Sequence, residues 1–228
     1  GFVIARRLLE EGARITVILC DGPPVSPSSR DMLSRLEKSD ASVLDLAPEP
    51  YRAAEAVRGA DVVVDAVFGI GFRGALPDAV RGLFRAANAG TAPIIAVDVP
   101  SGLNADTSGA DPDTLKAGLT VTFTAAKPGL VSRAGAAYCG RLVVVPIGID
   151  EALVALFAAR AHESADAAEI TAAMLRPCLP PRRRDAHKGD FGRLLLLCGS
   201  PGMAGAAVLA AEAALRCGVG LCELALPR

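Results

Sequence analysis

The sequence predicts an α/β protein built on a doubly wound parallel sheet. Short apolar, β-branched segments alternate with amphipathic segments, as expected where helices cover both faces of a parallel sheet. Three of the apolar segments also lead into glycine-containing loops, near Gly69, Gly102 and Gly199. Ligands of open α/β sheets bind in the crevice beyond the carboxyl ends of the strands. The pattern therefore predicts the fold class and the edge at which a ligand would bind.

The composition excludes several classes of protein. Of 228 residues, 51% are hydrophobic and 21% are charged, which is typical of a soluble globular protein with one large or two smaller domains. The formal net charge of −1 gives no reason to expect a nucleic-acid surface, and no apolar run is long enough to span a membrane. The six cysteines show no metal-type spacing with the two histidines, so we expect free thiols in a reducing, cytoplasmic environment.

The first part of the chain contains the alternating elements in order. We expect helices at residues 1–12, 28–38, 51–57 and 77–87, and strands at 14–19, 43–46, 62–67, 93–97, 119–124 and 141–146. Gly12 is expected to end the first helix, and Pro77 to lie in the first turn of the fourth. The run at residues 62–67 is almost wholly apolar and β-branched, which predicts a strand buried on both faces.

The stretch ADVVVDAVFGIGFRGA, residues 60–75, organises the rest of the chain. Asp65 interrupts its strand near the carboxyl end, and the loop that follows contains three glycines and Arg73. Because glycine has no Cβ, a ligand can approach the backbone closely and the N–H groups can turn toward it. A tight turn with a surface arginine is the alternative interpretation.

A second carboxylate, Asp98, follows the next strand and begins the stretch DVPSGLNADTSG. Two parallel strands that end in aspartate place both carboxylates at one edge of the sheet. With the hydroxyl of Ser101 and loop carbonyls, they would suit a hard cation, which prefers oxygen ligands. These residue types are also common in turns, which is the alternative interpretation. Lys127, in the loop after the following strand, is expected to be solvated.

The composition changes after residue 149. Residues 150–168 are rich in alanine and predict a helical linker, residues 168–175 predict a short helix, and the arginines at 182–184 predict a solvated connection. A strand at 193–198, a glycine-rich loop and a helix at 206–217 then form a unit that can bind phosphate. Because the sequence starts inside a helical pattern and stops inside a strand pattern, we expect an internal fragment of a longer protein.

Several ordered motifs resemble known enzyme families. The motifs VDAVFGIGFRG, AVDVPSGLNADTSG and TFTAAKPGL resemble the NAD(P)H-hydrate epimerase domain, also called the YjeF N-terminal domain, which has a Rossmann-like sheet. The motifs HKGDFG, GSPGMAGAA and AALRCGVGL resemble the start of ADP-dependent NAD(P)H-hydrate dehydratase, a ribokinase-like α/β domain. The resemblance implies an epimerase domain lacking its N-terminal part at 1–149, a linker at 150–185, and the truncated start of the dehydratase domain at 186–228.

The resemblance also implies which residues form the site. A potassium ion would be held by Asp65 and Ser101, with an asparagine from an NNGGDG-like loop whose last glycine is Gly1. Asp98 would contact the hydrated cofactor and is the candidate general base, because Asp65 is expected to bind the cation. The remaining residues of the implied substrate site are Gly69, Ile70, Gly71, Phe72, Arg73, Gly74 and Ala75. The family commonly has threonine where this chain has Ile70, which removes one hydroxyl and leaves the backbone N–H.

The implied activity is repair of NADH or NADPH that has gained water. The epimerase interconverts the R and S forms of this substrate, NAD(P)HX, and the dehydratase part of the parent protein removes water from the S form with ADP or ATP. We expect no nucleic-acid or membrane partner, self-association into a homo-oligomer is left open, and this fragment is expected to be inactive or nearly so.

Two rival functions fit parts of the sequence. Similar domains occur in RNA-decapping scaffolds and in a lipoprotein-binding protein, which would make this chain an interaction module, although the intact Asp65, Asp98 and Ser101 favour activity. An ordinary NAD-dependent dehydrogenase would need GxGxxG after the first strand, whereas here the glycine loop follows a later strand and Arg73 interrupts it.

Overall fold

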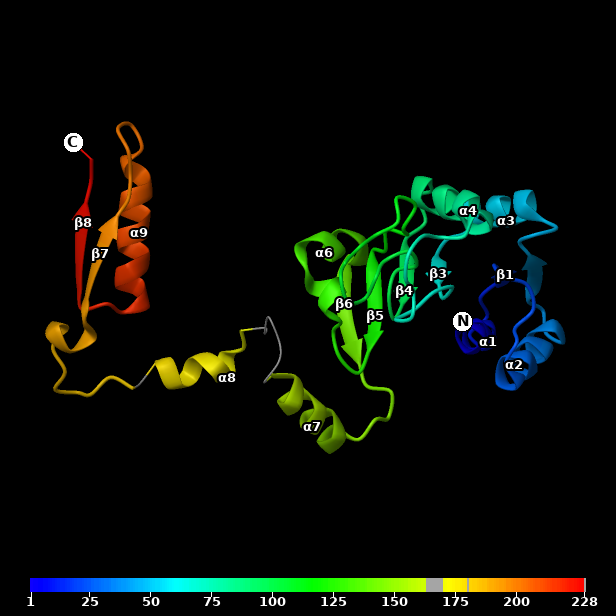
Figure 1. Ribbon diagram of the computed structural model, residues 1–228, viewed down its shortest axis with the longest axis horizontal. Coiled ribbons are helices and arrows are strands. Elements are labelled where there is room, and N and C mark those ends of the chain that lie inside the picture. Colours follow the sequence, from blue (N-terminus) through cyan, green and yellow to red (C-terminus); the bar gives the residue numbers. More distant parts are fainter. Residues whose placement is uncertain (163–169, 180, 228) are drawn as a thin grey trace. The chain divides into compact units, whose positions relative to one another are not determined.

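The computed structural model describes residues 1–162, 170–179 and 181–227 (Figure 1). The chain divides into two compact units, Gly1–Ala161 and His162–Arg228. Part of the predicted linker helix falls on residues 163–169, which lie outside the described residues. The predicted domain limits at 149 and 186 stay predictions.

The first unit alternates helices and strands as the sequence pattern indicates. Its elements are α1 (Phe2–Glu10), β1 (Thr16–Leu19), α2 (Pro27–Glu37), β2 (Ser42–Asp45), α3 (Pro50–Arg58), β3 (Val63–Asp65), α4 (Asp78–Ala89), β4 (Ile94–Val97), β5 (Leu119–Phe123), α5 (Pro128–Val131), α6 (Arg133–Cys139), β6 (Arg141–Val145) and α7 (Glu151–His162). Local signals explain several boundaries. The Ser26 hydroxyl accepts a hydrogen bond from the Ser29 N–H at the start of α2, where Pro27 is the first helical residue.

All strands of the first unit pair in parallel, and they form two sheets. The sheet β3-β4-β5-β6 has four strands, and β1-β2 is a separate pair (Figure 1). The prediction of one continuous sheet is wrong for the described residues, because β1 and β3, which would have to be joined through the sheet, each pair with one strand only. The α/β class and the parallel pairing are confirmed.

The four-stranded sheet has one well-buried face. Asp65, Ala96 and Thr120 stand in register on adjacent strands of this face, and each is at most 2% exposed. One buried cluster joins this face to α3 and α4, and the Thr120 hydroxyl donates a hydrogen bond to the Cys139 carbonyl of α6 at 2.8 Å.

The opposite face is more open. Val64 lies on it and is 37% exposed, and the preceding Val62 is 47% exposed. The predicted burial of this strand on both faces is therefore wrong. The physical reason is that both buried clusters contact the other face, so the sheet lacks an equally tight cover on this side.

The larger core also anchors the connection from β3 to α4. Phe72 and Leu76 are 9% and 3% exposed and pack in the same cluster as Val80 and Phe84 of α4. The Phe72 ring lies 5.3 Å from the Phe68 ring, measured between centroids. The glycine loop is thus fixed to the core through Phe72, and the chain directly after the loop is fixed through Leu76.

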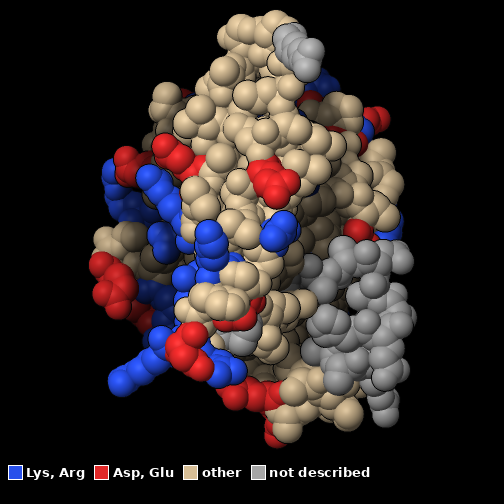
Figure 2. All heavy atoms as spheres, turned by 90° about the vertical axis from the view of Figure 1, so that its left-hand side faces the viewer, with Lys and Arg blue, Asp and Glu red and all other residues tan. Residues whose placement is uncertain are grey.

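The second unit is a small β–α–β arrangement. It contains α8 (Ala172–Leu175), the 3₁₀ turns η1 (Arg176–Cys178) and η2 (Lys188–Phe191), β7 (Arg193–Leu197), α9 (Ala204–Cys217) and β8 (Leu221–Ala225). Strands β7 and β8 pair in parallel along their full length. The upper part of Figure 2, where β7, α9 and β8 lie, carries mostly side chains that are neither acidic nor basic, in line with the 58% and 77% exposure of Leu195 and Leu197.

The arginine run before this unit is more engaged than the sequence suggests. Arg182 lies over the Phe191 ring at 4.3 Å and donates a hydrogen bond to the Gly218 carbonyl at 2.9 Å. This carbonyl belongs to the C-cap residue of α9, where a positive charge interacts favourably with the helix dipole. The run stays exposed, as predicted for a solvated connection, and Arg182 in addition makes these two contacts. Among the described residues, no helix has the length and apolar character needed to cross a membrane.

Candidate active site

Asp65 and Ser101 form a buried pair beyond the carboxyl ends of β3 and β4. The Ser101 hydroxyl donates to Asp65 Oδ1 at 2.6 Å, and the Ser101 backbone N–H donates to Oδ2 at 2.7 Å. The two residues are 2% and 1% exposed. The Ser101 hydroxyl oxygen also accepts from the Phe68 N–H at 2.8 Å, so one side chain joins the loops that follow the two strands.

Burial raises the pKa of Asp65 to about 6, although hydrogen bonds from Ser101 and from the Val67 N–H act in the opposite direction. Within the described ranges, no Lys or Arg side chain forms an ion pair with this carboxylate. A buried carboxylate without a positive partner is costly, and a bound cation would remove that cost.

The donor chemistry at this pair fits a monovalent cation. The Asp65 carboxylate and the Ser101 hydroxyl lie close to the Phe68 carbonyl, which is 3.4 Å from the Ser101 oxygen, and hard cations prefer such oxygen ligands. These oxygens are too few for a full coordination shell, so further oxygens would have to come from other groups or water. The described residues contain no cluster of three His, Cys, Asp or Glu side chains suited to a metal.

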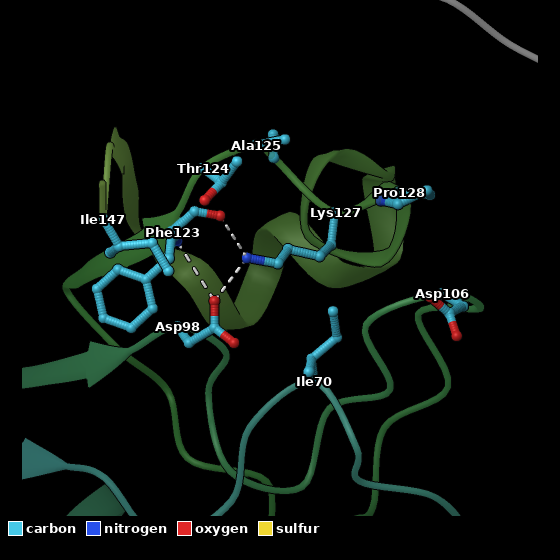
Figure 3. A pocket seen from close by; sticks show the side chains of 10 residues that line it. Ile70, Asp98, Asp106, Phe123, Thr124, Ala125, Lys127, Pro128 and Ile147 are labelled. Atoms are coloured by element: carbon cyan, nitrogen blue, oxygen red, sulfur yellow. Dashed lines mark hydrogen bonds and ion pairs between the residues drawn. The ribbon is translucent and has the colours of Figure 1, made fainter. Parts of the chain in front are cut away.

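Asp98 directly follows β4 and adopts a backbone conformation that is uncommon for a residue with a side chain, with φ of 70°. Its Oδ1 accepts hydrogen bonds from Lys127 Nζ at 2.5 Å and from the Phe123 N–H at 3.3 Å (Figure 3), and a third from the Thr122 hydroxyl at 3.2 Å. Among the described residues Oδ2 has no hydrogen-bond partner. A Cβ built on Gly69 would lie 3.7 Å from Oδ2, so this oxygen faces the glycine loop.

Lys127 keeps Asp98 ionised. Burial alone would raise the pKa of Asp98, but the hydrogen bond and charge of Lys127, with the hydrogen bonds from the Phe123 N–H and the Thr122 hydroxyl, hold the pKa below its ordinary value. The side chains of Lys127 and Asp98 are 12% and 17% exposed, so bulk water screens this ion pair little. The prediction that Lys127 is solvated is wrong.

An open cleft of about 500 Å³ lies beside this ion pair, within the size range of small-molecule sites. It is formed beyond the carboxyl ends of β4, β5 and β6, with one residue of the glycine loop (Figure 3). The residues that line it are Ile70, Asp98, Asp106, Phe123, Thr124, Ala125, Ala126, Lys127, Pro128 and Ile147. Asp65 and Ser101 do not line this cleft, so the Asp65–Ser101 pair and the cleft are separate features of the same sheet edge.

The glycine loop contributes less side-chain surface to the cleft than the sequence suggests. Of the predicted residues from Gly69 to Ala75, only Ile70 lines it, and Phe72 points into the core. The Arg73 guanidinium donates to the Ile70 and Phe72 carbonyls at 2.9 and 2.8 Å and pairs with Asp106 at 2.5 Å. Gly74 has φ of 79°, a conformation that favours glycine.

Comparison with known proteins places this geometry in a family. The profile of the family described as "YjeF-related protein N-terminus" matches residues 1–129, more than half of the chain. The chain belongs to this family. A Moorella thermoacetica protein named "Bifunctional NAD(P)H-hydrate repair enzyme Nnr" is 43% identical over 234 residues, which cover 100% of this chain and 42% of that protein. A Coxiella burnetii protein of the same name is 36% identical, covering 99% of this chain and 44% of that protein.

The chain thus spans about two fifths of the length of the curated relatives it matches. Among solved structures, the yeast protein YNL200c is similar at a TM-score of 0.49 and 23% identity, covering 56% of this chain and 54% of that chain. The YjeF-related match ends at residue 129, before β6 and before the whole second unit.

Sequence reasoning about the YjeF-related domain missed the role of Lys127. The available signal was its position four residues after Phe123, at the same sheet edge as Asp98, immediately before Pro128 and Gly129. A lone lysine in a loop is usually solvated, and only the path of the loop from Phe123 to Lys127 turns this side chain back toward Asp98. Thr122, whose hydroxyl accepts from Lys127 Nζ at 2.7 Å, was missed for the same reason.

Proposed function

We propose that this YjeF-related domain interconverts the R and S epimers of NAD(P)HX, the hydrated forms of NADH and NADPH, in the cleft beside Asp98. The observation that carries the proposal is the Asp98 carboxylate, whose Oδ1 is held by three donors while Oδ2 has no hydrogen-bond partner among the described residues. The names of the relatives, which are NAD(P)H-hydrate repair enzymes, support the substrate class.

The chemistry of the substrate explains why such a carboxylate is needed. Water adds to the enamine double bond of a dihydropyridine ring at the carbon next to nitrogen, because the nitrogen lone pair stabilises positive charge there. The product carries a hydroxyl on that carbon. Inverting the carbon requires one of its bonds, to oxygen or to nitrogen, to break and to form again on the opposite face. When the carbon–nitrogen bond breaks, the hydroxyl loses its proton as the carbonyl forms and the ring nitrogen gains one, and both transfers reverse when the ring closes on the opposite face. The ionised Asp98 Oδ2 can accept the hydroxyl proton, pass it to the nitrogen and carry out the reverse transfers.

A potassium ion at Asp65 and Ser101 would supply positive charge next to the glycine loop. The Ser101 hydroxyl, which donates to Asp65, also accepts a hydrogen bond from the N–H of Phe68, the residue just before that loop. Backbone N–H groups of the loop from Gly69 to Ala75 would hold the diphosphate, and Arg73 would maintain the conformation of that loop through its hydrogen bonds to the Ile70 and Phe72 carbonyls. In the longer relatives, dehydration with ADP or ATP would belong to a second, ribokinase-like domain, and we infer that residues 186–228 are its start. We propose no ADP chemistry for the residues described.

The test is Asp98→Asn in the protein as its gene encodes it. Asparagine preserves the shape of the side chain but cannot accept a proton, so epimer interconversion, followed by chromatography of separated R- and S-NADHX, should slow by about 10²–10⁴-fold. Asp61→Asn removes an exposed carboxylate outside the cleft and is the matched control. Wild-type protein that binds NADHX without interconverting its epimers would contradict the proposal and favour an interaction module.

A further inference from the structure

We propose that Lys127 is the positioning residue for Asp98: it holds Oδ1 against the end of β5 so that Oδ2 is presented to the substrate. This inference rests on the proposed function and adds to it the residue that sets the orientation of the reacting carboxylate. Lys127 belongs neither to the glycine loop nor to the Asp65–Ser101 pair.

The hydrogen bonds of the lysine ammonium show that its role is positioning. Lys127 Nζ has three N–H groups and three acceptors. Two of them, Asp98 Oδ1 at 2.5 Å and the Phe123 carbonyl at 3.0 Å, are drawn in Figure 3, and the third is the Thr122 hydroxyl at 2.7 Å. No N–H group is left for a substrate while this arrangement persists. Lys127 therefore acts on the reaction through Asp98.

The backbone around Lys127 is fixed independently of the ion pair. The Gly129 N–H donates to the Ala105 carbonyl at 2.7 Å, and Gly129 is packed so closely against the backbone of Asn104 that a Cβ could not be accommodated. Residues 128–131 form the short helix α5, whose Leu130 is 1% exposed in the second buried cluster. The loop that carries Lys127 is thus attached to the loop that carries Asp98.

The charges around the cleft leave Lys127 as the partner that controls Asp98. Asp106 also lines the cleft, but its carboxylate is paired with Arg73 at the more exposed rim, where the two side chains are 56% and 54% exposed. Removing the Lys127 charge should raise the pKa of Asp98, since burial would then act without the opposing ion pair.

A double-mutant cycle separates positioning from general structural support. In the protein as its gene encodes it, Lys127→Met should lower kcat/KM for NADHX interconversion by about 100-fold. In the Asp98→Asn background the same change should cause little further loss, because the carboxylate that Lys127 orients is already absent. Lys116→Met, at an exposed position in the same domain, is the matched control and should keep wild-type activity.

The pH profile gives a second readout that a merely structural role would not move. Activity should fall as pH drops through the pKa of Asp98. This acidic limb should move to higher pH in Lys127→Met and stay near its wild-type position in Lys127→Arg, which retains the positive charge. Independent losses in the double-mutant cycle together with an unmoved acidic limb would overturn the inference.

One measurement needs no variant and remains decisive if Lys127→Met does not fold. A carbon-detected NMR titration of the wild-type carboxylates should place the pKa of Asp98 below the ordinary value of about 3.9, and a value at or above it would overturn the inference. Wild-type protein without epimerase activity would overturn the proposed function and this inference together. An active wild type with an equally active Lys127→Met would overturn this inference alone.

Discussion

Ser101 donates two hydrogen bonds to the same carboxylate, from its hydroxyl to Asp65 Oδ1 and from its backbone N–H to Asp65 Oδ2, at 2.6 and 2.7 Å. Asp65 is the last residue of β3 and Ser101 lies shortly after the neighbouring parallel strand β4, so these bonds set the spacing of the two loops at the carboxyl edge of the sheet. The same hydroxyl also accepts a hydrogen bond from the Phe68 N–H, which extends the connection to the glycine loop. Any ion bound at Asp65 would therefore affect both loops of the candidate site.

Asp65→Asn should weaken the dependence of the protein on potassium. The amide has no negative charge, so the potassium concentration for half-maximal epimerase activity should rise by at least about tenfold. Wild-type protein should also melt at a higher temperature in potassium chloride than in choline chloride of equal ionic strength, and the variant should lose this difference. An unchanged response of Asp65→Asn in both measurements would remove Asp65 from the cation site, and Asp61→Asn is the control for the loss of an exposed carboxylate.

Much of the candidate site could be predicted from the sequence, because ligands of open α/β sheets bind beyond the carboxyl ends of the strands. Asp65 and Asp98 each follow a short apolar segment, and parallel pairing of β3 with β4 necessarily brings their ends to one edge. The approach of Ser101 to Asp65 depends only on the short turn after Asp98, so the spacing of these residues already favours it. The α/β class followed from the same alternation of segments.

Other features could not be predicted because they depend on loop paths and on cover from elsewhere in the fold. The direction of Lys127 follows from the turn after β5, where Thr124 adopts φ of 65°, a conformation rare for a β-branched residue. An apolar strand pattern is the same whether one face or both are covered, so the exposure of Val64 could not be deduced. Nothing in the periodicity distinguishes one continuous sheet from two.

Arg73 should matter for binding through the conformation of the glycine loop. Its guanidinium is engaged with the Ile70 and Phe72 carbonyls, so Arg73→Ala should raise KM for NADHX by about tenfold, the equivalent of one charged hydrogen bond, with a smaller effect on kcat. Because Arg73 is exposed, the unfolding midpoint in urea should hardly change. Asp106→Ala breaks the ion pair, keeps the carbonyl contacts of Arg73 and also removes a carboxylate from the cleft rim, and it should have the smaller effect on KM. An equal or larger increase in KM would contradict the role given to the carbonyl contacts.

Asp111 should stabilise the connection from the glycine loop to α4 in a pH-dependent way. Its carboxylate accepts from Arg81 at 2.8 and 3.0 Å and from the Leu76 N–H at 2.9 Å. The hydrogen bonds from Arg81 lower the pKa of Asp111 to about 2, against the effect of burial. Asp111→Asn should therefore reduce the free energy of unfolding at neutral pH by about 2–3 kcal/mol.

The sign of the pH effect follows from the lowered pKa. The stabilisation is fully present above the pKa of the unfolded state, about 3.9, and is lost as pH falls toward the folded value. The difference in the free energy of unfolding between wild type and Asp111→Asn, measured in urea, should thus be constant from about pH 5 to about pH 8 and should shrink below about pH 4. Asp78 pairs with the same Arg81 from a fully exposed position, so Asp78→Asn should cause little change. A pH-independent difference down to pH 2 (about the folded pKa) would assign the effect of Asp111→Asn to lost packing.

Gly102 is the position at which an added methyl group should disturb the Asp65–Ser101 pair without changing either of those two side chains. Its φ is 102°, and a Cβ there would lie 2.9 Å from the Thr114 Cα and 2.6 Å from the Thr114 hydroxyl oxygen. Because the Thr114 Cα is backbone and Thr114 is fully buried, the neighbour cannot simply rotate away. Gly102→Ala should therefore reduce the free energy of unfolding by roughly 2–3 kcal/mol and shift the adjacent Ser101 away from Asp65. Urea unfolding and the potassium-dependent rise in melting temperature measure the two effects separately.

Gly109→Ala, where φ is not positive and a Cβ would lie 3.4 Å from the Thr107 hydroxyl, is the matched control in the same loop. If Gly102→Ala lost stability but kept its response to potassium, the strain would be absorbed toward Thr114, and the position of Ser101 would be set by Asp65 and Phe68 instead of by the turn.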